Sequence, residues 1–159
     1  MPTDVTILEG GLEIHVARQF DYPIDLVWRA FTEAAGLRRW WGPRGYEVTA
    51  CEVDLRPGGS WRMVQRAPDG NEYGFHGEYL EIEPPRRLVQ TFIFDGAPDD
   101  VVHETMMLEP LGAGTVLRGV SRFPSRESLE ESLAAGMMEG MLETYDRLEE
   151  HLAGSRERV

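Results

Sequence analysis

Four histidines and one cysteine are the side chains in this sequence best suited to metal binding or nucleophilic chemistry. The histidines are scattered, and none is spaced from Cys51 or from a carboxylate as a zinc-ligand set requires. They stand at His15, His76, His103 and His151. We therefore expect no metal and no cofactor. Cys51 is alone, which excludes an internal disulfide and is typical of a buried strand cysteine rather than a reactive thiol.

A strand histidine near a carboxylate is the arrangement in this chain that could move a proton. His76 and Glu78 share one strand face, and His103 lies on a later strand next to Glu104. If these faces meet inside a cavity, His103 with Glu104 or Glu78 could polarise a ligand carbonyl or act as an acid–base pair. The competing interpretation, which we prefer, is a solvent-facing strand residue. His103 and Glu104 are the candidate catalytic residues, but the sequence favours a binding protein over an enzyme.

The cations are all arginine, 16 in number, so lysine Schiff-base and lysine general-base chemistry is excluded. Arg62 and Arg118 stand in mid-strand, where they could bind an acidic ligand group or lie in solvent on the outer face. The sequence contains no nucleophile elbow, phosphate loop or dinucleotide fingerprint. No known catalytic motif is therefore present.

The composition is that of an acidic globular protein. A chain of 159 residues that is 42% hydrophobic can bury a core in one domain. We expect an N-terminal segment at 1–11, a single domain at 12–152 and a flexible tail at 153–159. The formal net charge of −12 disfavours nucleic acid and anionic membranes as partners. No apolar run approaches the roughly 18 residues of a membrane span and no secretory signal is visible, so we expect a cytoplasmic protein without membrane insertion.

Alternating apolar runs predict seven strands, separated by turns rich in proline, glycine and aspartate. The strands span Leu12–Phe20, Tyr46–Asp54, Ser60–Arg66, Glu72–Ile82, Leu88–Phe94, Val102–Glu109 and Thr115–Arg122. Two short helices are expected after the first strand, one that opens at Pro23 and one over Glu33–Trp41 that Thr32 caps. The short links favour antiparallel pairing, and this order of elements predicts an α+β fold.

A long helix from Ser125 to Leu152 is expected to complete the fold. Its apolar stripe must pack on the sheet, an arrangement that tends to enclose a pocket. Gly136 and Gly140 lie within this helix, where they either permit close packing on the sheet or leave room for a cavity wall. The candidate ligand-binding residues are Trp61, Met63, Phe75, Tyr79, Phe92, Gly136, Met137, Gly140 and Met141.

Several motifs, taken in their order along the chain, resemble one family. They are Val27-Trp28, Trp40-Trp41-Gly42-Pro43, Asp54-Leu55-Arg56-Pro57-Gly58-Gly59, Gly77-Glu78-Tyr79, Pro84-Pro85-Arg86-Arg87-Leu88, and Gly136-Met137 with Gly140. From Leu12 to Leu152 the chain is similar to bacterial proteins related to the C-terminal domain of the heat-shock chaperone ATPase activator (Aha-type). These proteins belong to the SRPBCC, or START-like, superfamily, which also holds birch-pollen-allergen-like proteins and polyketide cyclases.

The resemblance implies a helix-grip fold, in which a curved antiparallel sheet of about seven strands wraps around the C-terminal helix with a cavity between them. We therefore expect the protein to bind a hydrophobic or aromatic small molecule of unknown identity. One alternative is a cyclase- or hydrolase-like enzyme acting in that cavity. The other is an interaction protein, either a homodimer or a chaperone partner, with an exposed apolar surface around Trp40 and Trp41. A co-chaperone role does not carry over directly, because the eukaryotic activator uses a separate N-terminal domain for its chaperone.

Overall fold

The computed structural model describes residues 4–7 and 12–157, which contain one antiparallel sheet of eight strands. Neighbouring strands follow the order β1-β2-β8-β7-β6-β5-β4-β3. Their bounds are β1 Asp4–Ile7, β2 Glu13–Phe20, β3 Glu47–Val53, β4 Ser60–Arg66, β5 Glu72–Glu83, β6 Arg87–Phe94, β7 Val102–Leu111 and β8 Gly114–Arg122. The predicted α+β helix-grip fold is confirmed. β1 is an additional strand within the predicted N-terminal segment, the rest of which lies outside the described residues.

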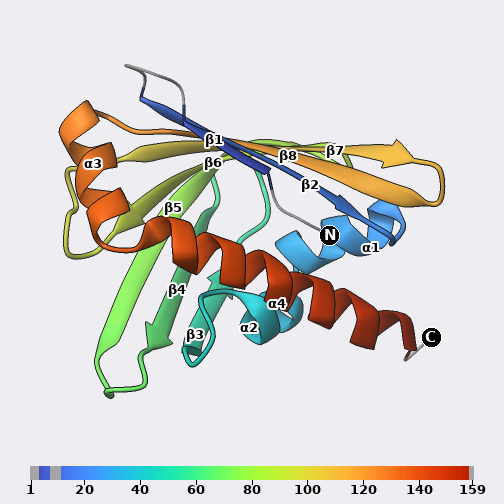
Figure 1. Ribbon diagram of the computed structural model, residues 1–159, viewed down its shortest axis with the longest axis horizontal. Helices are drawn as coiled ribbons and strands as arrows, with labels where there is room; N and C mark the ends of the chain where they lie inside the picture. Colours follow the sequence, from blue (N-terminus) through green and yellow to red (C-terminus); the bar gives the residue numbers. More distant parts are fainter. Residues whose placement is uncertain (1–3, 8–11, 158–159) are drawn as a thin grey trace.

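The described residues also form four helices, namely α1 Ile24–Thr32, α2 Ala34–Trp40, α3 Arg126–Ala134 and α4 Met137–Glu157. The sheet is strongly curved, because β3, β4 and β5 bend away from the layer formed by the other strands, and α4 crosses its hollow side (Figure 1). Among the described helices, none has the length and apolar character needed to cross a bilayer.

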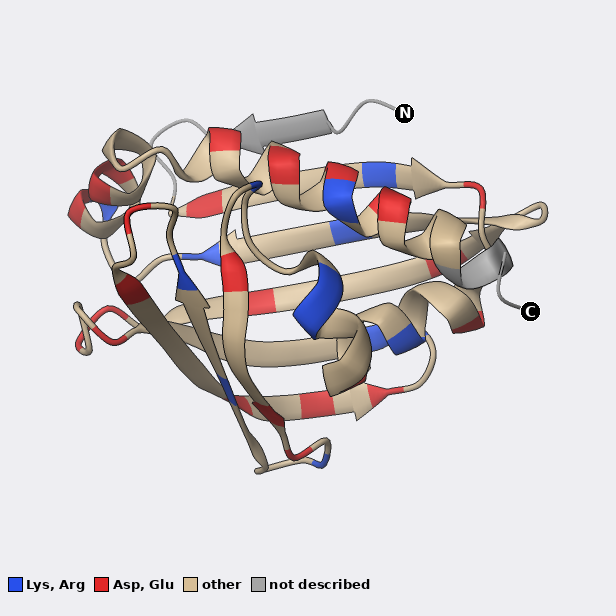
Figure 2. Ribbon diagram, turned by 90° about the horizontal axis from the view of Figure 1, so that it is seen from below, with Lys and Arg blue, Asp and Glu red and all other residues tan. Residues whose placement is uncertain are grey.

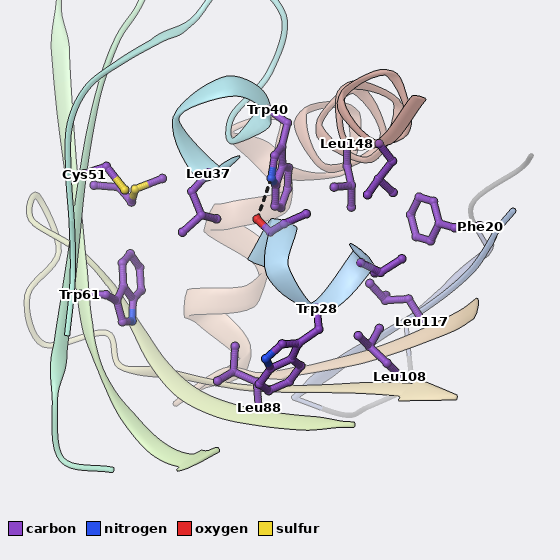
Figure 3. Packing of buried hydrophobic residues seen from close by; sticks show 14 of the residues in the cluster. Phe20, Trp28, Leu37, Trp40, Cys51, Trp61, Leu88, Leu108, Leu117 and Leu148 are labelled. Carbon is purple, nitrogen blue, oxygen red and sulfur yellow. Dashed lines mark hydrogen bonds between the residues drawn. The ribbon is translucent and has the colours of Figure 1, made fainter. Parts of the chain in front are cut away.

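The two short helices are held together by side-chain contacts to the backbone. Pro23 takes the N-cap position of α1 with a φ of −65°, which suits a helix start. The predicted capping of α2 by Thr32 is wrong, since Thr32 Oγ1 instead donates to the Trp28 carbonyl oxygen within α1 at 2.9 Å. Trp40 Nε1 donates to the Ala30 carbonyl oxygen, also at 2.9 Å, and so fixes α2 against α1 (Figure 3).

The predicted single C-terminal helix is in fact two helices, so the prediction of one continuous helix is wrong. Ser125 Oγ accepts a hydrogen bond from the Ser128 amide at 3.0 Å and caps α3, as its position in the sequence predicted. Gly136 follows α3 with a φ of +91°, a backbone conformation that strains residues with a side chain. The chain then turns into α4, which continues to Glu157, beyond the predicted end at Leu152.

The apolar core falls into two clusters at opposite ends of α4. The larger cluster joins α1 and α2 to the sheet and to the C-terminal half of α4, with Trp28, Trp40 and Leu148 deeply buried (Figure 3). The smaller cluster lies under α3 and contains Ile14, Phe123 and Leu129. Met137, Met141 and Tyr145 in the N-terminal half of α4 are partly buried and pack against this smaller cluster.

Ion pairs from one buried arginine tie α4 to β2. Arg18 is on the inner face of β2, where its side chain is only 1% exposed. It donates to Asp146 at 3.0 Å and to Glu149 at 2.7 Å, both on α4. Because a buried guanidinium needs counter-charges, this network fixes where α4 crosses the sheet.

Candidate functional site

A cavity of about 600 Å³ lies between the inner face of the sheet and the N-terminal half of α4. Six of the predicted ligand-binding residues line it: Trp61, Met63, Tyr79, Phe92, Met137 and Met141. The first four come from three adjacent strands and the two methionines from α4. The structure thus brings together, around one space, side chains that are far apart in the sequence.

Trp61 is positioned in the wall by a glycine on the neighbouring strand. Its Nε1 donates to the Thr91 carbonyl oxygen on β6 at 3.1 Å, and to do so the indole passes over Gly77 of β5. A Cβ atom at Gly77 would come within 2.5 Å of Trp61 Nε1 and within 1.9 Å of the Thr91 oxygen. Gly77 is therefore required for the close approach that satisfies the buried indole nitrogen.

Aromatic rings continue from this wall toward α2. Phe92 lies 5.8 Å from Trp61 and 5.3 Å from Phe75 between ring centroids, and Phe75 lies 5.2 Å from Trp41. Phe75 is not among the lining residues, so it supports Phe92 and Trp41 instead of facing the cavity. Burial raises the pKa of Tyr79 to about 12, which keeps its phenol neutral at physiological pH.

A group of polar side chains, which we call the Glu104 cluster, interrupts the apolar lining. It consists of Gln90, Glu104, Ser121 and Tyr145, all of which line the cavity. Gln90, Glu104 and Ser121 lie directly opposite one another on β6, β7 and β8. Gln90 Nε2 donates to Glu104 Oε1 at 3.0 Å, and Ser121 also hydrogen-bonds to the carboxyl group.

The apolar surroundings change the acidity of both acids in this cluster. Burial raises the pKa of Glu104 above its usual range, and the hydrogen bonds from Gln90 and Ser121 oppose that rise. Burial, followed by the negative charge of Glu104, raises the pKa of Tyr145. The Tyr145 hydroxyl oxygen lies over Gly119 of β8, 4.0 Å from where a Cβ atom of that glycine would stand. A Cβ atom there would make only an ordinary van der Waals contact with the phenol.

One end of the cavity is acidic and reaches the surface. Glu131 of α3 and Ala135, which follows α3, are exposed lining residues, and the half-buried Asp100 of the β6–β7 loop also lines the cavity. We infer that the opening lies between α3 and this loop. Acidic residues are also frequent along α3 and α4 (Figure 2). A ligand that enters here therefore passes negatively charged groups.

The two predicted glycines lie at the α3–α4 corner rather than along the cavity wall. Gly136 forms the turn itself, and neither glycine is among the lining residues. A Cβ atom on Gly140 would stand 3.3 Å from Pro43 Cγ, so this glycine lets α4 approach the loop after α2. Their predicted contact with a ligand stays a prediction.

The candidate acid–base residues are on opposite faces of the sheet. Glu104 points into the cavity, whereas its neighbour His103 is exposed on the outer face, because successive strand residues alternate. His103 and Glu104 therefore do not form a pair inside the cavity. His76 is likewise exposed on the outer face, where its Nδ1 lies 2.7 Å from Asp95.

The two mid-strand arginines are also outside the cavity. Arg62 donates to Asp95 at 2.8 Å on the outer face, and Arg118 is exposed there as well. Within residues 12–154, no group of three or more histidine, cysteine, aspartate or glutamate side chains is placed to hold a metal ion. Trp40, predicted as part of an exposed apolar surface, is instead 3% exposed, and Trp41 packs on Phe75.

Sequence reasoning missed Gln90 and Ser121, although a signal for them exists. Gln90 stands in the inward register of β6 between Leu88 and Phe92, which also line the cavity. Ser121 stands in the inward register of β8 between Gly119 and Phe123 and lies opposite Glu104. A polar residue at the inward position of adjacent strands is unusual in a sheet core. Aligning the three strands by register would have revealed the cluster.

The comparison with known families decides the classification. A family model described as "Activator of Hsp90 ATPase homolog 1-like protein" matches residues 21–153. The chain belongs to this family. The resemblance predicted from its motifs is thereby confirmed. A comparison with curated protein sequences gave no match.

Solved structures of similar proteins share the whole fold of this family. A protein from Arthrobacter aurescens is 28% identical with a TM-score of 0.88, and the match covers 95% of this chain and 91% of that one. A Rhodobacter sphaeroides protein is 27% identical with a TM-score of 0.87, covering 96% and 99%. The protein NE0264 from Nitrosomonas europaea is 29% identical with a TM-score of 0.83, covering 91% and 96%. None of these three is named for an activity.

Proposed function

We propose that this protein binds a hydrophobic or aromatic small molecule in the cavity between the sheet and α4. The observation that carries the proposal is the cavity itself, whose volume of about 600 Å³ lies within the range of small-molecule sites, roughly 300–1,000 Å³. Membership of the Aha1-like family is compatible with such a role.

The size of the cavity argues against a purely structural interior. Protein cores pack as densely as organic crystals and contain few voids larger than a water molecule. Here α4 packs against both apolar clusters, and the cavity remains between α4 and the sheet. When a hydrophobic ligand covers apolar cavity surface and removes it from water, the free energy of the system falls, which favours binding.

The wall residues suggest how a ligand would be held. Trp61 and Phe92 offer aromatic faces fixed by the sheet, while Met137 and Met141 offer flexible thioether side chains on α4. A rigid aromatic wall opposite an adaptable one suits a planar apolar molecule, and it tolerates some variation in shape. The neutral phenol of Tyr79 adds a hydrogen-bonding group without adding charge.

A neutral fluorescent probe, phenylnaphthylamine, tests the proposal when it is titrated into the protein. The matched variants are Met141→Trp, which fills the cavity from α4, and Leu142→Trp, which places the same bulk on the neighbouring exposed position. We expect wild type and Leu142→Trp to bind the probe alike, and Met141→Trp to bind at least about tenfold more weakly, a loss of roughly 1.4 kcal/mol. Equal binding by all three proteins, or none by wild type, would refute the proposal.

A further inference from the structure

We propose that the cavity selects hydrophobic amines, and that the ligand's ammonium group pairs with the carboxylate of Glu104. This inference rests on the proposed function and specifies the chemical class of the ligand. It predicts that a cationic molecule is preferred over a neutral or an anionic one with the same apolar skeleton.

The charges of the lining support a cationic ligand. Three acidic residues line the cavity, Asp100, Glu104 and Glu131, whereas no arginine or histidine does so among the described residues. The net charge of −12 adds a long-range attraction for cations. An anionic ligand such as a fatty acid would meet negative charge both at the opening and inside, while a cation would be attracted at both places.

The geometry around Glu104 provides a place for the ammonium group. The carboxyl group accepts hydrogen bonds from Gln90 and Ser121, and both of these donors favour its ionised form. No ion pair to Glu104 is formed by any described arginine or histidine. A carboxylate buried without a counter-ion is costly, so a cation supplied by the ligand would offset that cost.

The remaining contacts of the site also suit an amine. A carboxylate that already accepts from two neutral donors still has acceptor sites for an ammonium group, which carries several N–H bonds. The aromatic ring of Tyr145, a member of the Glu104 cluster, can attract a cation, whereas Trp61 and Phe92 supply the apolar wall. The polar end of the ligand would then lie beside Glu104, with its apolar part directed toward the aromatic wall.

A competition experiment with three ligands of one skeleton tests the inference. The experiment measures how well each of three competitors displaces the phenylnaphthylamine probe: naphthylethylamine, naphthylethanol and naphthylacetate. It is carried out on wild type, Glu104→Gln and Glu109→Gln. Glu109 is the matched control, since it is an exposed glutamate on the outer face of the same strand and its substitution removes the same charge. Glutamine at position 104 keeps a similar shape and can still hydrogen-bond to Gln90 and Ser121.

We expect the amine to bind wild type at least about tenfold more tightly than the alcohol, and the carboxylate to bind most weakly. That advantage should fall to within about twofold in Glu104→Gln and persist in Glu109→Gln, while the alcohol binds all three proteins alike. If the probe and all three ligands bind without an advantage for the amine, or if Glu104→Gln keeps it, the inference is wrong and the proposed function stands. If the probe does not bind wild type, both fail.

Discussion

Glu104 shows how strongly the surroundings of one residue can alter its chemistry. On the outer face of β7 a glutamate would be solvated, as Glu109 is. On the inner face the same side chain is held among apolar walls, with Gln90 and Ser121 as its hydrogen-bond donors. Burial disfavours its charged form, so we expect the ionised residue to lower the stability of the ligand-free folded protein.

The pH dependence of stability should therefore change in the Glu104→Gln variant. Because the pKa of Glu104 is raised in the folded state, the folded protein keeps this proton at pH values where the unfolded chain has lost it. Wild type should lose unfolding free energy relative to the variant as the pH rises above the ordinary glutamate pKa, and the difference should level off above the folded pKa. Each unit of the raised pKa corresponds to about 1.4 kcal/mol.

Urea unfolding of ligand-free protein between about pH 4 and pH 8 measures this difference. The exposed substitution Glu109→Gln serves as the control and should alter stability by less than about 0.5 kcal/mol. A Glu104→Gln variant whose stability relative to wild type stays constant or falls with rising pH would show that the carboxyl group is not penalised by burial.

At the level of single residues, the sequence predicted the apolar lining of the cavity better than its polar cluster. Trp61, Met63, Tyr79 and Phe92 alternate along their strands in the way that inward residues do, and all four line the cavity. The prediction that His103 pairs with Glu104 relied on their adjacency along the chain and neglected the alternation of strand faces. That alternation separates the two residues on opposite sides of β7.

The break between α3 and α4 is the element that most directly shapes the cavity. Gly136 turns the chain with a φ of +91°, so that α3 covers one end of the sheet while α4 crosses it. The apolar stripe at spacings of three and four continues through this position, which is why periodicity alone indicated one helix. A glycine costs a helix only about 1 kcal/mol and therefore does not by itself predict a break.

Substituting this glycine should destabilise the protein, because a side chain strains the left-handed conformation. We expect Gly136→Ala to lower the unfolding free energy by roughly 1–2 kcal/mol. Gly154→Ala is the matched control within α4, where a Cβ atom has no heavy atom within 4 Å, so it should raise stability by up to about 1 kcal/mol. Changes of opposite sign in the unfolding free energies of the two variants, measured by urea unfolding, would support a turn at Gly136 between α3 and α4. Stabilisation by Gly136→Ala would instead favour one continuous helix.

Strand and turn positions were predictable from local patterns, whereas the relation between elements was not. The strands Ser60–Arg66 and Val102–Leu111 were anticipated to within two residues at each end, because turn residues bound their alternating runs. The ion pairs of Arg18 with Asp146 and Glu149 join residues far apart in the sequence. Nothing in the local pattern around Arg18 indicates that a helix covers it.

For the molecule as a whole, the central feature is a sheet and a helix that are held apart. The larger cluster fixes the C-terminal half of α4, the smaller one fixes α3, and the space between them is the cavity. The family match and the structural relatives show that this architecture extends over nearly the whole chain. Because both the sheet and α4 contribute to the cavity wall, a bound ligand should contact residues from both of them.

Methyl resonances of the methionines allow the most direct test of where a ligand binds. Four methionines line the cavity, Met63, Met106, Met137 and Met141, whereas Met107 is on the outer face and Met138 is not a lining residue. Spectra of protein labelled with carbon-13 at the methionine methyl groups would be recorded with and without phenylnaphthylamine. We predict that the four cavity methyl signals shift together while those of Met107 and Met138 stay in place. Shifts confined to Met107 or Met138, or no shifts at saturating probe, would contradict a ligand site between the sheet and α4.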